Sequence, residues 1–183
     1  MKYFKNKKVL LNLIYILLVF SFIFLISFIF DLKIKKEAEN LEYNRFLKEL
    51  LTLINNLEFD KISENKDKKR YEVTNNDNLV SIIYIEEGKG VSGNYKIAIV
   101  YEIVSDNEYI INNFKVIESS KKDNEYVLKV ESNEQFKNNI INKDINDLDD
   151  IDIVSGATIT SNEIIKAINS SKDKLLDKGN INE

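Results

Sequence analysis

The sequence predicts an α+β fold, in which an N-terminal transmembrane helix and a helical stalk precede a mostly antiparallel sheet and a closing helix. Three observations predict this arrangement. A long apolar run near the start has the length of a membrane span. Apolar residues then recur at helical spacing, and further along the chain their period changes to two, as in strands. The 183 residues accommodate one globular domain with appendages.

The apolar run covers residues 9–30 and contains no charged side chain. Four lysines precede it in residues 1–8, whereas the lysines that follow it are partly offset by acidic residues. This bias predicts a single-pass protein of the cell membrane, with a basic cytoplasmic N-terminus and an extracytoplasmic domain. A cleaved signal peptide is the alternative. It would have a shorter apolar region and an A-x-A-like cleavage site, and this run has neither.

Residues 31–70 are predicted to form the stalk and a polar connector. Apolar residues recur every three or four positions in the stalk, which predicts a helix over residues 31–57. The connector that follows is polar and contains a run of charges at residues 66–70, which is typical of a solvated loop.

The domain is predicted over residues 71–177, with a tail at residues 178–183. Strands are expected at residues 79–85, 95–104 and 110–118, and a turn with a short fourth strand at residues 121–132. A short helix is expected around Phe136, Ile140 and Ile141, and the closing helix at residues 164–176. Three of the five glycines, Gly88, Gly90 and Gly93, fall close together, which predicts positive φ or close approach of the backbone.

Composition excludes several classes of site. The chain has no cysteine and no histidine, so it cannot form a disulfide, a thiolate metal site or a histidine-based catalytic centre. Its net charge is -4, with both signs interleaved, which gives no electrostatic case for binding nucleic acid.

The stretch IDIVSGATITSNEII, residues 151–165, contains the candidate site. Thr160 and Glu163 match a capping box, which predicts that the closing helix begins just after Thr160. The amides at the start of a helix bind anions, and Gly156 and Ala157 leave room for a phosphate. Thr158 adds a hydroxyl, but a threonine needs an external base to act as a nucleophile. The alternative is an ordinary capped helix start with a glycine turn.

Residues 152–158, DIVSGAT, match the D-x-x-S/T-G-A-T/S flavinylation motif. The chain therefore resembles FMN-binding domains such as the G subunit of the Rnf complex and the C subunit of the sodium-translocating NADH:quinone reductase. The glycine-rich segment before the second predicted strand, and an anchor ahead of the domain, are also similar. The resemblance implies that a separate flavin transferase joins FMN through its phosphate to Thr158. Asp152 takes the place of the motif's acidic residue.

The resemblance implies further site residues. Ser155, Gly156 and Ala157 take the other fixed places of the motif. Glu118 takes the place of the first residue of the E-T-P-G-L-G stretch that Rnf G subunits carry near the flavin, but the proline and glycines of that stretch are missing here.

The first hypothesis is a membrane-anchored electron-transfer flavoprotein that is not catalytic alone. Its partners would be the other membrane subunits of an Rnf-type ion-translocating oxidoreductase, the flavin transferase and the lipid bilayer. In such a protein the cofactor carries out the redox chemistry, which requires neither histidine nor cysteine. The first alternative is a stand-alone surface flavoprotein that passes electrons to extracellular acceptors. The second is a non-enzymatic bitopic scaffold of the cell envelope.

Overall fold

The computed structural model describes residues 2–54, 56–67, 69–105, 108–148 and 151–176. Within this range the side chains of residues 2–14, 16 and 19 are not described. The chain divides into two parts, residues 1–47 and residues 48–183, and each is described by itself.

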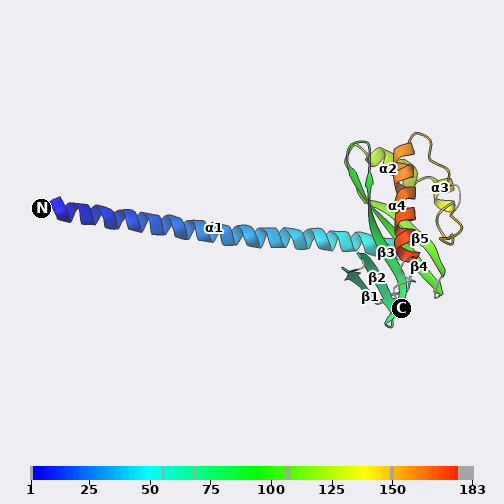
Figure 1. Cartoon of the computed structure of the whole chain (residues 1–183), viewed down its shortest axis with the longest axis horizontal. Helices are drawn as coiled ribbons and strands as arrows, with labels where there is room; N and C mark the ends of the chain where they lie inside the picture. Colours follow the sequence, from blue (N-terminus) through cyan, green and yellow to red (C-terminus); the bar gives the residue numbers. More distant parts are fainter. Residues whose placement is uncertain (1, 55, 68, 106–107, 149–150, 177–183) are drawn as a thin grey trace. The chain divides into compact units, whose positions relative to one another are not determined.

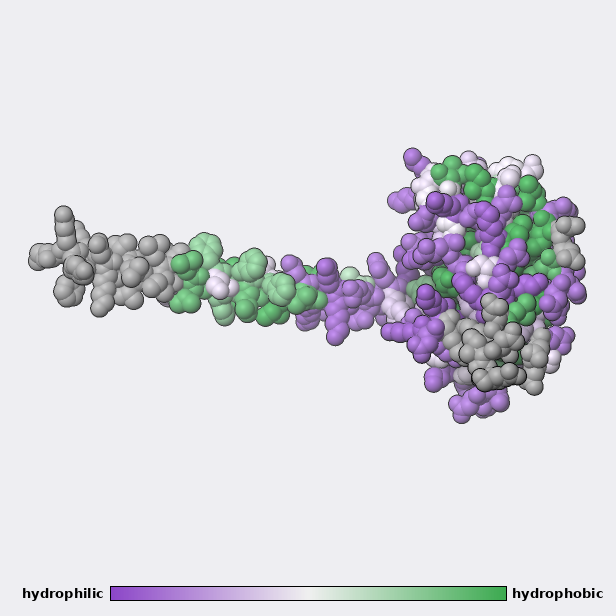
Figure 2. Space-filling view, viewed as in Figure 1, coloured by the Kyte–Doolittle hydropathy of each residue, from purple (hydrophilic) through white to green (hydrophobic). Residues whose placement is uncertain are grey.

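Helix α1 (Lys2–Leu53) exposes large apolar side chains between Tyr15 and Ile34, and Figure 2 shows a hydrophobic stretch on this helix in green. Among the residues whose side chains the structure describes, no helix has an apolar stretch long enough to cross a membrane. The predicted fold class included a transmembrane helix at residues 9–30, and this part of the prediction is therefore wrong. The described apolar run starts at Tyr15 and meets the first charge at Asp31, whereas a span needs ~20 residues. The side chains at 9–14, 16 and 19 lie outside the described residues.

The predicted stalk is the continuation of α1, which ends at Leu53 and not at residue 57. In the second part of the chain, Leu50, Leu53 and Ile54 are buried. The side-chain amide of Asn113 donates a hydrogen bond to the carbonyl of Leu53 at 3.2 Å. This bond satisfies one of the carbonyls that the end of a helix leaves without a partner.

The predicted antiparallel sheet is confirmed. Its five strands follow the order β1-β2-β3-β4-β5, and every neighbouring pair is antiparallel (Figure 1). The strands are β1 (Lys61–Asn65), β2 (Arg70–Asn75), β3 (Asn78–Lys89), β4 (Asn94–Ser105) and β5 (Glu108–Glu118). Strand β1 lies in the predicted loop, because its alternating polar residues give no apolar pattern to detect.

The turn between β2 and β3 has two residues, Asn76 and Asp77, with φ of 50° and 62°. A two-residue hairpin with both central residues at positive φ fits the right-handed twist of its strands. Asn and Asp tolerate this conformation better than other residues with a side chain.

Three helices follow the sheet: α2 (Asn124–Glu131), α3 (Glu134–Asn138) and α4 (Thr158–Leu176). The short strand predicted within residues 121–132 is wrong, because α2 occupies this segment. Val127 and Val130 are buried three positions apart, as on one face of a helix, whereas Leu128 is exposed. A short helix is present as α3, in which Phe136 is buried, but it ends at Asn138, so Ile140 and Ile141 lie outside it.

The core lies between the sheet and the helices. Helix α4 packs against β3 and β4 (Figure 1). The hydroxyl of Tyr101 on β4 lies 2.6 Å from Ser171 Oγ on α4, and burial raises the pKa of this tyrosine. The nearly buried carboxylate of Glu86 on β3 pairs with the ammonium of Lys174 at 2.6 Å. These polar contacts fix α4 along the sheet, and its first turn carries the predicted motif.

Candidate functional site

A tight turn precedes α4 and contains the predicted motif. Gly156 has φ of 74°, a conformation that residues with a Cβ adopt only with strain. The amide of Ala157 donates to the carbonyl of Val154 at 3.0 Å, and α4 begins at the next residue, Thr158. The glycine therefore lets the chain reverse direction directly into the helix.

Ser161 holds this turn from inside the protein. Its buried hydroxyl donates to the carbonyl of Ala157 at 3.0 Å and accepts from the amide of Val154 at 3.1 Å. The hydroxyl thus satisfies one backbone group on each side of Gly156. Buried backbone groups need such partners, so this serine fixes the shape of the turn.

The predicted capping box is wrong. Helix α4 begins at Thr158, three residues before the start that the capping box predicts, so Thr160 lies within the helix. The hydroxyl of Thr160 is buried and lies 3.1 Å from the hydroxyl of Tyr95 on β4. The carboxylate of Glu163 accepts from the amide of Lys89 at 2.8 Å. Both side chains therefore join α4 to the hairpin between β3 and β4.

Two pKa shifts accompany these contacts. Burial raises the pKa of Tyr95, and its hydrogen bond with Thr160 opposes this effect. Burial would also raise the pKa of Glu163, but hydrogen bonds from the side chain of Lys166 and the amide of Lys89 outweigh it, so this pKa is lowered. Glu163 is therefore held in its charged form near the first turn of α4.

Thr158 is exposed at the start of a 19-residue helix. Ser155 and Gly156 are also exposed, and Ala157 is buried beneath them. The first amides of a helix lack partners within it and carry partial positive charge, so the surface of this turn favours an anion. Asp152, also exposed, precedes the turn.

Lys129, in the last turn of α2, lies at the same place and was not predicted from the sequence. A Cβ added to Gly156 would lie 2.6 Å from Lys129 Nζ, so the ammonium rests against the turn. The sequence gives no signal for this proximity, because the two residues are far apart along the chain. Their approach depends on α2, whereas the sequence predicts a short strand in this segment.

The glycine-rich turn between β3 and β4 uses glycine differently. None of Gly88, Gly90 and Gly93 has positive φ, so the prediction of close approach is the one confirmed. A Cβ on Gly90 would lie 2.5 Å from Asp123 Oδ2 and 2.6 Å from the ring of Tyr95.

The buried carboxylate of Asp123 holds this turn. It accepts from the amide of Ser92 at 3.1 Å and from the hydroxyl of Ser120 at 2.7 Å. Across the turn, the amide of Gly90 donates to the carbonyl of Gly93 at 2.7 Å. The loop that precedes α2 and the hairpin of β3 and β4 therefore form one rigid unit.

Glu118 lies apart from the other predicted site residues. It is the last residue of β5, it is exposed, and it pairs with Lys96 of β4. Within the described residues no hydrogen bond joins it to the turn before α4. Ser155, Gly156, Ala157 and Thr158 lie together in the turn, whereas Thr160 is buried against Tyr95.

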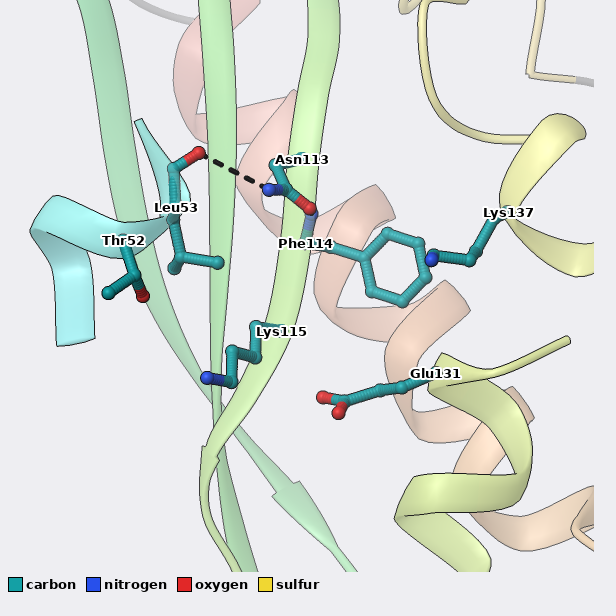
Figure 3. A pocket seen from close by; sticks show the side chains of 7 residues that line it. All are labelled: Thr52, Leu53, Asn113, Phe114, Lys115, Glu131 and Lys137. Carbon is teal, nitrogen blue, oxygen red and sulfur yellow. Dashed lines mark hydrogen bonds between the residues drawn. The ribbon is translucent and has the colours of Figure 1, made fainter. Parts of the chain in front are cut away.

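A cavity of about 240 Å³ lies elsewhere in the second part of the chain, between the end of α1, β5 and the two short helices (Figure 3). Figure 3 shows the Glu131 carboxylate extending from α2 toward β5, where it accepts from the amide of Val116 at 2.8 Å. Burial raises the pKa of Glu131, while that hydrogen bond and the charges of Lys115 and Lys137 oppose the shift. No predicted site residue lines this cavity.

The part of the chain that the structure describes contains no cluster of acidic residues placed to hold a metal ion. A family model described as an FMN-binding domain matches residues 69–172. This match covers more than half of the chain and includes both glycine turns and helix α2. No curated protein matches the chain.

Proposed function

The chain belongs to the FMN-binding domain family, and on this premise we propose that it is an electron-transfer flavoprotein whose FMN is joined through its phosphate to Thr158. The observation that carries this proposal is the position of the Thr158 hydroxyl. It belongs to the first residue of α4, which is exposed, whereas Thr160 and Ser161 are buried and their hydroxyls are hydrogen-bonded.

The turn before α4 suits an attached phosphate. Gly156 has no side chain to obstruct the approach of a bulky group, and the first amides of α4 favour its negative charge. The exposed hydroxyl of Ser155 lies in the loop, outside the helix, so it lacks the same placement on the first turn. These features favour Thr158 as the attachment residue.

Attachment requires help from another protein. Thr158 Oγ must lose its proton and form a bond to phosphorus, while the bond from that phosphorus to the other half of a flavin dinucleotide donor breaks and a mononucleotide leaves. A threonine hydroxyl is a weak nucleophile without a base. Of the hydrogen bonds described for the turn, none joins the Thr158 hydroxyl to a carboxylate that could take its proton. We therefore propose a separate flavin transferase as the maturation partner.

Bound FMN would supply the redox chemistry, since a flavin exchanges one or two electrons. The protein's own residues would hold and orient it. Thr158 would provide the covalent link and Ser161 fixes the turn, while Glu163 holds the neighbouring hairpin against α4 and Asp123 holds it against the loop before α2. An attachment that is not lost by dissociation suits a carrier whose cofactor shuttles electrons between partners.

The partners remain proposals. We propose that the flavoprotein serves an Rnf-type ion-translocating oxidoreductase, and copurification of its subunits would test this. A stand-alone carrier for extracellular acceptors is the second candidate, because residues 118–126 lack the proline and glycines of the Rnf G stretch. The location at the cell membrane, with the domain outside the cytoplasm, stays a prediction that fractionation and protease accessibility of intact cells would test.

The test of the attachment residue compares Thr158→Ala, Thr158→Ser and Ser155→Ala, each produced with a flavin transferase. We expect flavin fluorescence in denaturing gels to be lost in Thr158→Ala and kept in the other two. Serine keeps the hydroxyl, and Ser155→Ala is the matched control from the same turn. Fluorescence that persists in folded Thr158→Ala would place the link on another residue, and a colourless wild type would refute covalent attachment.

A further inference from the structure

The ammonium of Lys129 lies at the surface of the turn before α4, and the structure raises the question of its role. Lys129 Nζ rests against Gly156, and the exposed hydroxyl of Thr158 lies two residues further along the turn. We propose that Lys129 is the phosphate-binding residue of the flavin site, and that its ammonium pairs with the phosphodiester formed on Thr158. This inference rests on the proposed function and adds to it a residue outside the motif.

Gly156 permits this approach. A Cβ at this position would lie 2.6 Å from Lys129 Nζ and 3.7 Å from Lys129 Cε, so any other residue would displace the ammonium. The backbone at this position has φ of 74°, which favours glycine, and the missing side chain leaves the space that the ammonium occupies. The same position thus determines both the path of the turn and the location of the positive charge.

Two other lysines, both in α4, are already paired. Lys166 lies 2.6 Å from Glu163, and Lys174 lies 2.6 Å from Glu86. Lys129 makes no ion pair with any acidic residue that the structure describes. Its charge is therefore available to an anion at the turn, where the first amides of α4 also favour negative charge.

The chemistry of the ligand fits one ammonium. A phosphodiester between the flavin ribityl chain and Thr158 carries a single negative charge at neutral pH. One ammonium and the amides of the first helical turn are sufficient to balance it, without a second basic residue or a metal ion. Hydrogen bonds between an ammonium and a phosphate oxygen are stronger than those between neutral groups.

Lys129 also lies in the last turn of α2, where a positive charge stabilises a helix. This structural role predicts an effect on unfolding but none on the attached phosphate. A test must therefore measure the phosphate directly, in addition to the amount of flavin attached.

The experiment uses the full chain, flavin adenine dinucleotide as donor and a flavin transferase. The variants are Lys129→Gln, Lys129→Arg and the control Lys122→Gln, which removes another exposed lysine ahead of α2. We expect Lys129→Gln to slow attachment about two- to fivefold, as for loss of an exposed charge pair. Lys129→Arg keeps the charge and should stay near the wild-type rate, as should Lys122→Gln.

The second readout is the phosphorus NMR resonance of the attached FMN in each purified product. We expect it to move in Lys129→Gln and to remain in place in Lys122→Gln. An unchanged rate and an unchanged resonance in Lys129→Gln would overturn the role of Lys129, while the wild type still carried FMN. A wild type that accepts no FMN would instead overturn the proposed function, and this inference with it.

Discussion

The two glycine turns of the domain use the same residue for opposite purposes. In the hairpin between β3 and β4, glycine has ordinary φ and lets the backbone pack against Asp123 and the ring of Tyr95. In the turn before α4, Gly156 has positive φ, and Ser155 and Thr158 are exposed while Ala157 is buried. Buried side chains pack against the glycine of the first turn, whereas the surface of the second turn is exposed to solvent.

This difference suggests a structural role for the β3–β4 turn and a functional role for the turn before α4. The buried Asp123 carboxylate beside the β3–β4 turn accepts hydrogen bonds from an amide and a hydroxyl, so it is already satisfied within the protein. The open turn presents the exposed Thr158 and the ammonium of Lys129, while Ser161 in the same turn is buried and hydrogen-bonded. Substitutions in the first turn should therefore change stability, and substitutions in the second should change the attachment of FMN.

The largest loss of stability is expected for Gly90→Ala. The new Cβ would lie 2.5 Å from Asp123 Oδ2 and 2.6 Å from two ring atoms of Tyr95, all of which are buried. Overpacking of this kind typically costs 1–3 kcal/mol, and we expect about 3 kcal/mol here. Denaturant unfolding measures it. A loss of unfolding free energy below about 1 kcal/mol would show that the β3–β4 turn can shift to accommodate the new Cβ, which would contradict its structural role.

Gly156→Ala should have an intermediate effect on stability and a larger one on function. Its φ of 74° would cost about 1–2 kcal/mol with a side chain present, whereas Lys129 can move aside. We expect slower attachment of FMN in a protein that still folds, measured by intact mass over time. Wild-type attachment in this variant would show that the path of the turn is unimportant for the site.

The stability contributed by Glu163 should depend on pH. Because its pKa is lowered in the folded protein, the ionised carboxylate stabilises the fold above its ordinary pKa, and this contribution is lost as the pH falls through the folded value. Glu163→Gln should therefore be less stable than the wild type at pH 7, and the difference should vanish in acid. A difference that is constant with pH would mean that packing alone is responsible.

Glu131 should show a smaller effect of opposite sign. Its pKa is raised, chiefly by burial, so stability present below its ordinary pKa is lost as the pH rises through the folded value. Glu131→Gln should gain stability relative to the wild type between acid and pH 7, because its amide cannot ionise. Thermal unfolding at both pH values measures this, and equal differences would contradict it.

Much of the sheet could be predicted from the sequence. Residues 95–104 alternate and are rich in β-branched side chains, and they form β4. The motif also located the turn before α4. These features are local, so they are visible without knowledge of the fold.

What the sequence could not show depends on contacts between distant segments. Thr160 and Glu163 match a capping box, yet both contact the β3–β4 hairpin, and this tertiary role prevails over the local one. Lys129 approaches Gly156 only because α2 and α4 pack together. The length of the apolar run near the start predicts a transmembrane helix. Among the residues whose side chains the structure describes, however, the apolar stretch is too short to span a membrane.

The central claim is that the exposed hydroxyl of the open turn carries the flavin. The most direct measurement is peptide sequencing by mass spectrometry of the protein produced with a flavin transferase. The account predicts that the mass of FMN, less one water, is found on Thr158. The same mass on Ser155, Thr160 or Ser161, or an unmodified peptide in this region, would contradict it.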